Sequence, residues 1–199
     1  DKAISKTYNG GIYLLSITPD GKIYYTANEK KKNSEEYESY IVFDGKEKKA
    51  FMSVYNPKVY SGDRLVYTAQ LSDDSYAIVN GDDEIRINKK LIVQSAGLLD
   101  DGTLAYICTE YGDYEKKIKD KYYAYIGNNK FGPYDGMMML DYEKNNFIVS
   151  DKKGNYAYLV NNIKDYTDYY YVLYTNSGKS KEFDIISDVN LYNGKAKPG

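Results

Sequence analysis

The side chains that could do chemistry in this chain are restricted in type. Among its 199 residues there is no histidine, a single cysteine and only two arginines, Arg64 and Arg86. A serine–histidine–aspartate or cysteine–histidine triad therefore cannot be assembled from this chain. Zinc sites of the common histidine or cysteine kinds and histidine-ligated haem are excluded for the same reason. Carboxylates, lysines and 26 tyrosines remain as the candidates for function.

The carboxylates gather in short runs. Calcium takes six to eight oxygen ligands, usually from acidic residues at alternate positions around a glycine, and no run has that spacing. Neighbouring acids in a strand point to opposite faces. We therefore interpret the runs as solvated turn residues and predict no catalytic residue, no metal site and no cofactor, with a glycosidase-type carboxylate pair left open. The runs are Asp73–Asp74, Asp82–Glu84 and Asp100–Asp101.

One turn resembles a motif of known enzymes. The stretch Ser150–Tyr156 is similar to the Asp-box of sialidase-like propellers. Sialidase chemistry needs three arginines to clamp the substrate carboxylate, in a bidentate geometry that lysine does not reproduce. Since the chain has two arginines, we expect no sialidase activity.

The elements that would position a site repeat along the chain. A short apolar strand, a glycine turn and a second apolar strand recur four times, and an aromatic strand with its own glycine turn follows each time. The first glycines are 41, 40 and 52 residues apart, at Gly21, Gly62, Gly102 and Gly154. Glycine between hydrophobic runs favours a hairpin, and four antiparallel strands every ~40 residues are typical of propeller blades.

The predicted fold class is therefore all-β, a β-propeller of four-stranded antiparallel blades, with four blades visible plus the start of a fifth. We expect almost no helix, because no window has a sustained 3.6-residue period. The whole chain, 1–199, is one domain or a fragment of one. Its repeats span approximately 10–54, 55–92, 93–139 and 140–187, with a partial repeat at 188–199.

Several details of these repeats are predicted as well. The fourth strand of a repeat is expected at 50–54, at 84–87 and at 183–186, and Met137–Met139 is expected in a strand core. The fifth repeat is expected to contain a first strand and turn, at 189–195, and no second strand. We expect that the chain is part of a longer propeller, or that the ring closes by pairing the two ends.

The turn and its flanking strands resemble the bacterial WD40-like propeller repeat of the TolB type. The best match is Ile17–Tyr25, which carries the Pro-Asp-Gly-Lys turn between two apolar strands. The segment Gly127–Gly136 is also similar to such repeats. The resemblance implies a propeller, and family members serve as periplasmic or surface binding modules or as propellers attached to hydrolases. The matching positions are structural turns, so no functional residue is carried over.

Long connections after the second strand of a repeat are the predicted ligand face. They span approximately 28–38, 110–121 and 161–168, and they carry tyrosines among charged residues. Tyrosine offers rigid amphipathic contact area at a low entropic cost and is favoured at recognition surfaces. Surface tyrosines with no binding role remain the alternative interpretation. The candidates are Tyr37, Tyr111, Tyr114, Tyr166 and Tyr169.

Charge and hydropathy limit the partners. A formal net charge of −2, from 27 basic and 29 acidic residues, argues against nucleic acid, and no apolar run is long enough to span a bilayer. Cys108 lies in an apolar strand and is predicted to be a buried, inert side chain. We expect a periplasmic, cell-surface or secreted protein.

The leading functional hypothesis is a noncatalytic binding or scaffold module that recognises a protein or a glycan through the long loops. One alternative is an enzyme-associated propeller, either a glycosidase or the gating domain of a hydrolase. Another is a structural subunit of a surface assembly, since open blade edges could pair between chains.

Overall fold

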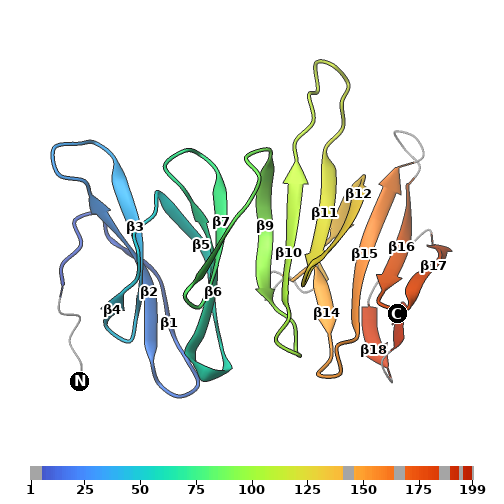
Figure 1. Cartoon of the computed structure of the whole chain (residues 1–199), viewed down its shortest axis with the longest axis horizontal. Helices are drawn as coiled ribbons and strands as arrows, with labels where there is room; N and C mark the ends of the chain where they lie inside the picture. The colour runs from blue at the N-terminus through green and yellow to red at the C-terminus, as the bar shows by residue number, and fades with distance from the viewer. Residues whose placement is uncertain (1–5, 141–145, 164–168, 184–188, 193–194, 199) are drawn as a thin grey trace. The chain divides into compact units, whose positions relative to one another are not determined.

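The computed structural model describes residues 6–140, 146–163, 169–183, 189–192 and 195–198 (Figure 1). The chain divides into two compact units, 1–89 and 90–199.

The first unit contains two antiparallel sheets of four strands. Each sheet follows chain order, so neighbouring strands are joined by hairpins. The first sheet comprises β1 (Ile12–Ile17), β2 (Ile23–Lys30), β3 (Tyr37–Phe43) and β4 (Lys46–Glu47). The second comprises β5 (Ser53–Tyr60), β6 (Arg64–Gln70), β7 (Tyr76–Asn80) and β8 (Asp83–Arg86).

The second unit contains two larger sheets and a hairpin. Its first sheet has β9 (Leu91–Leu98), β10 (Leu104–Glu110), β11 (Lys121–Ile126) and β12 (Asn129–Tyr134). The next has β13 (Gly136–Met138), β14 (Ile148–Ser150), β15 (Tyr156–Ile163), β16 (Tyr169–Thr175) and β17 (Gly178–Phe183). The hairpin pairs β18 (Val189–Tyr192) with β19 (Lys195–Pro198).

The predicted all-β class and the four-stranded antiparallel sheets are confirmed. Within the described ranges the only helical segment is the 3-10 turn Ser61–Asp63, and no helix there is long and apolar enough to cross a membrane. The prediction of a fifth repeat without a second strand is wrong, because β19 forms and pairs with β18.

The expected fourth strands are confirmed in one of three repeats. The expected strand 84–87 overlaps β8. The expected strand 50–54 is wrong, because β4 lies earlier and Ser53 already begins β5; Phe51 alone bridges Ser39 of β3. In the fourth repeat the strand is β17, which ends at Phe183; residues 184–186 lie outside the described residues.

One five-residue turn recurs in four of the described hairpins, β1–β2, β6–β7, β9–β10 and β14–β15. Its first N–H donates to the fifth carbonyl, and its fourth N–H donates back to the first carbonyl, as in Leu99–Thr103, where both bonds are 2.9 Å. The fourth residue has a positive φ, 86° at Gly102, which glycine adopts without steric cost. The β5–β6 turn differs from the sequence prediction. It is the 3-10 turn, and both Gly62 and Asp63 have positive φ.

A tyrosine occupies the same place in the second strand of every repeat. In three of the four cases, this side chain packs on the element that precedes its sheet within the same unit. Tyr67 joins a core cluster with Ile41 and meets the ring of Phe51 edge-on. Because strand side chains alternate between faces, the residue after each tyrosine points the other way. The four residues are Tyr25, Tyr67, Tyr106 and Tyr158.

The largest aromatic cluster joins the two sheets of the second unit. Tyr158 of β15 is 1% exposed and packs with Ile107 and Ala124 of the neighbouring sheet. Its ring stacks on Tyr174 at 5.3 Å between centroids, with an interplanar angle of 5°. Its hydroxyl lies 2.9 Å from that of Tyr134 on β12. The many tyrosines are therefore core residues as well as surface residues.

The first strand of every sheet is irregular near that tyrosine. The pairing with the second strand shifts within β1, β5 and β9, and Asn56 in β5 has a φ of 49°. In the fourth sheet the break is larger. Consecutive residues Tyr158 and Leu159 pair with Ile148 of β14 and Met138 of β13. The segment 139–147 is therefore inserted at a bulge position, and it accounts for most of the longer 52-residue spacing.

This insertion also changes one repeat boundary. The pairing places β13 in the fourth sheet, whereas the predicted third repeat runs to residue 139. Met137 is buried in the core shared by the two sheets, as expected of a strand residue. The described ends of the insertion are held together, because the Leu140 N–H donates to the carbonyl of Asn146 at 2.8 Å.

Cys108 should not react with thiol reagents in the folded protein. Its side chain is fully buried in β10, and this burial raises its pKa to about 12. Thiolate is the reactive form, and three pKa units reduce its fraction about a thousandfold. We expect a disulfide reagent to label the protein stoichiometrically in urea and negligibly in buffer. Rapid labelling of the folded protein would contradict this burial.

Candidate functional site

The β10–β11 connection is the longest loop that the structure describes in full. It runs from 111 to 120 and projects past the ends of its own two strands (Figure 1). Asp120 ties its two ends together. One carboxylate oxygen accepts the N–H of Gly112 at 2.8 Å, and the other accepts the hydroxyl of Tyr114 at 3.2 Å. The charge of Asp120 also raises the pKa of Tyr114.

The loop backbone closes tightly on itself. The N–H of Ile118 donates to the carbonyl of Asp113 at 2.8 Å. A methyl group on Gly112 would lie 2.0 Å from the carbonyl oxygen of Ile118, so a side chain at this position would force the backbone apart. The loop therefore has a defined conformation, set by one glycine and one carboxylate.

The outer surface of this loop combines apolar side chains with cations. Tyr111, Tyr114 and Ile118 are 59%, 79% and 49% exposed. Lys116 pairs with Asp113 at 2.7 Å. Lys117 and Lys119 are exposed, and no ion pair joins either of them to another described residue. The loop thus offers two aromatic rings, an aliphatic side chain and two uncompensated ammonium groups.

The other predicted ligand-face tyrosines lie on other segments of the chain. Tyr37 is the first residue of β3, and a methyl group on Gly10 would come within 2.8 Å of its ring, so the ring packs on the N-terminal segment. Tyr169 begins β16. Tyr166 lies outside the described residues. Tyr111 and Tyr114 lie on the same loop.

The acidic runs serve turns and ion pairs. Asp73 accepts the hydroxyl of Ser75, which is the main reason that its pKa is lowered, and it pairs with Lys89 at 3.1 Å. Glu84 pairs with Lys49 at 2.6 Å. Among the residues with described positions, no group of three or more acidic or cysteine side chains could hold a metal ion.

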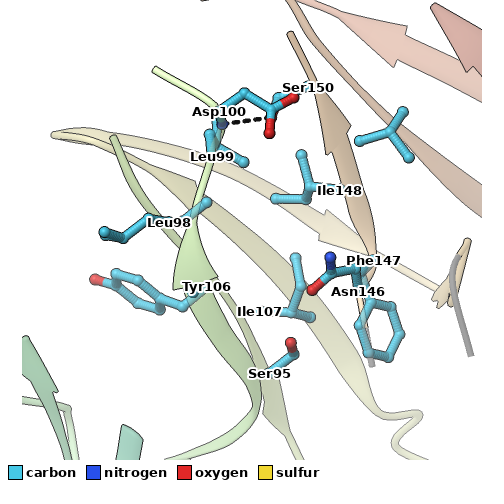
Figure 2. Close-up of a pocket in the computed structure, with 13 residues that line it drawn as sticks. Ser95, Leu98, Leu99, Asp100, Tyr106, Ile107, Asn146, Phe147, Ile148 and Ser150 are labelled. Carbon is cyan, nitrogen blue, oxygen red and sulfur yellow. Dashed lines mark hydrogen bonds between the residues drawn. The ribbon is translucent and has the colours of Figure 1, made fainter. Parts of the chain in front are cut away.

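A cavity of about 190 Å³ lies between the two sheets of the second unit. One wall comes from β9 and β10, including Gly97 and Ile107, and the other comes from β14. Figure 2 shows the lining side chains. At one end, the backbone N–H of Asp100 donates to the hydroxyl of Ser150 at 2.9 Å, which links the first turn of one sheet to β14 of the next (Figure 2).

Sequence reasoning did not find this cavity. The signal was the run of small residues at 95–97, which stands where the first strands of other sheets carry larger side chains. Small residues in a strand also occur for reasons of packing alone, so the run indicates a cavity only once the opposite wall is known.

Comparison with known proteins gives no assignment: no protein-family model, no curated protein and no solved structure matches this chain.

Proposed function

We propose that the antiparallel sheets are blades of a β-propeller of the WD40-like type, and that the domain is a noncatalytic binding module of an exported protein. Its β10–β11 loop binds a partner protein. The observation that carries this proposal is the exposure of Tyr111, Tyr114 and Ile118 on a loop whose backbone is fixed by Asp120. A fixed loop loses little conformational entropy on binding.

The chemistry of the loop defines the partner surface. Tyrosine and isoleucine side chains fill apolar pockets, and tyrosine is enriched among residues that dominate binding energy. Lys117 and Lys119, which no described carboxylate neutralises, favour acidic groups around such a pocket and speed association at low salt. The expected partner is therefore a protein with an apolar pocket bordered by aspartate or glutamate.

The binding role is tested with a triple variant of the loop, Tyr111→Ser, Tyr114→Ser and Ile118→Ser. A partner enriched from the extracellular fraction of the source cells is purified and titrated against each protein. We expect Kd to rise at least about 100-fold, because loss of two residues that dominate an interface costs this much or more. Tyr55→Ser, at a tyrosine that is 39% exposed on β5, is the control and should change Kd less than about twofold. Equal loss of binding in both variants would refute the role of the loop.

Loss of the Asp120 carboxylate should loosen the loop and leave the sheets intact. In Asp120→Ala, amides of the loop are expected to exchange hydrogen at least about tenfold faster, because two hydrogen bonds are lost. The global free energy of unfolding should fall by less than about 1 kcal/mol. Glu115→Ala removes the same charge from an exposed position of the loop and serves as the control. Identical exchange in the two variants would show that Asp120 does not hold the loop.

A further inference from the structure

The cavity in the second unit exists because β9 lacks large side chains on one face. In β9, Ser95 and Gly97 pair with Ile107 and Ala105. The corresponding pairs of the fourth sheet place Met138 and Val149 opposite Leu159 and Ala157. Serine and glycine replace methionine and valine on the face that points toward β14. Two side chains that would fill the space between the sheets are therefore missing.

The cavity lining is amphipathic. Leu99, Ile107 and Ile148 supply apolar surface, while Ser95, Asn146 and Ser150 supply hydroxyl and amide groups (Figure 2). The carboxylate of Asp100 lies at the same end as Ser150, and no hydrogen bond or ion pair joins it to another described residue. No lysine or arginine lines the cavity.

The polar groups at this end are arranged to bind hydroxyl groups. Ser150 already accepts the backbone N–H of Asp100, so its own hydroxyl hydrogen can be donated to a ligand. The Asp100 carboxylate can accept from a second ligand hydroxyl, in a charge-assisted and therefore strong hydrogen bond. The apolar side chains can pack on carbon-bound hydrogens of the same molecule.

We propose that this cavity binds a neutral polyhydroxylated molecule of monosaccharide size. The volume of about 190 Å³ corresponds to roughly six water molecules at about 30 Å³ each, which suits a single sugar ring. A lining without cations disfavours phosphates and carboxylates, and a single carboxylate among several hydroxyl and amide groups favours a polyol over a diamine. This site is separate from the β10–β11 loop and does not depend on the function proposed for it.

The test is a titration of the intact protein with neutral methyl hexosides and pentosides. Binding is measured by calorimetry and by saturation-transfer NMR. We expect at least one of these sugars to bind saturably with a Kd of about 1 mM, as expected of a small ligand. Gly97→Val introduces the residue found at the matching position of the fourth sheet, Val149, and should raise Kd at least tenfold by filling the cavity.

Two substitutions in one turn keep the test decisive if Gly97→Val does not fold. Asp100→Asn should raise Kd about fivefold or more, because it removes a charged acceptor. Asp101→Asn is the matched control: its carboxylate accepts the N–H of Thr103 at 2.9 Å and does not line the cavity, so Kd should change less than twofold. A disaccharide that binds as well as its terminal methyl glycoside would indicate that the natural ligand is the end of a glycan. A disaccharide that binds far more weakly would indicate that the natural ligand is a free sugar.

The proposal is overturned if no neutral sugar saturates, if putrescine or gluconate binds more tightly than every sugar, or if Asp100→Asn and Asp101→Asn behave alike. The triple loop variant should bind sugar normally, and Asp100→Asn should bind the partner protein normally. The proposal for the loop and the proposal for the cavity can therefore be refuted independently of each other.

Discussion

Tyr158→Ala is expected to lower the free energy of unfolding by about 3–5 kcal/mol. The side chain is 1% exposed and contacts both sheets of the second unit, so its removal leaves a cavity that the two sheets cannot close. The variant also loses the stacked contact with Tyr174 and the hydroxyl pair with Tyr134. Urea unfolding followed by far-UV circular dichroism measures the change.

A second substitution separates the ring from the hydroxyl. Tyr158→Phe keeps the stacked ring and removes one hydrogen bond, and it should cost about 1–2 kcal/mol. Tyr114→Ala, at a tyrosine that is 79% exposed, should change stability by less than about 0.5 kcal/mol. Equal effects of the alanine substitutions at Tyr158 and Tyr114 would mean that the two sheets do not share this core.

Stability should fall steeply above pH 10. Burial, with a smaller contribution from the charge of Glu84, raises the pKa of Tyr67 to about 12. An unfolded tyrosine loses its proton near pH 10, so the unfolded state binds fewer protons than the folded state above this pH. The stabilisation from Tyr67 is thus complete below pH 10 and is lost between pH 10 and 12. At about 1.4 kcal/mol per pH unit, the loss is roughly 3 kcal/mol.

Other buried tyrosines add to this alkaline loss. Burial, followed by the hydrogen bond with Tyr134, raises the pKa of Tyr158 as well, so the same sign applies. We expect the urea midpoint to drop sharply between about pH 10 and pH 12 and the drop to be smaller in Tyr67→Phe, which cannot ionise. Tyr55→Phe, at a partly exposed position, is the control. Its urea midpoint should drop as much as that of the unmodified protein, because lysine deprotonation affects all of these proteins equally. An unchanged slope in Tyr67→Phe would show that this hydroxyl is not buried.

Local turn chemistry explains why the sheet organisation could be predicted from the sequence. The glycines at 21, 102 and 154 occupy the positive-φ position of one shared turn, and only a few residue types are suited to such a backbone. Strand ends were less predictable. The apolar run 50–54 resembles an outer strand, yet Ser53 and Val54 pair with β6, because a neighbouring strand competes for the same residues and the sequence alone does not rank the two pairings.

The candidate site was predicted in part. Tyr111 and Tyr114 lie together on an exposed loop, as a tyrosine-bearing connection between strands suggests. The packing of Tyr37 on Gly10 was not predicted, because it depends on a chain segment 27 residues away. The cavity depends on two strands whose facing residues are about 50 positions apart, and such long-range pairs leave no local pattern.

The interrupted first strands have a consequence for the evolution and engineering of this protein. Where a ladder is already broken, added residues remove no further backbone hydrogen bonds, so lengthening the chain there costs little beyond loop closure. The segment 139–147 occupies such a position. The bulges of β5 and β9, at Asn56 and Gln94, are therefore natural acceptor sites for an epitope tag or a grafted peptide.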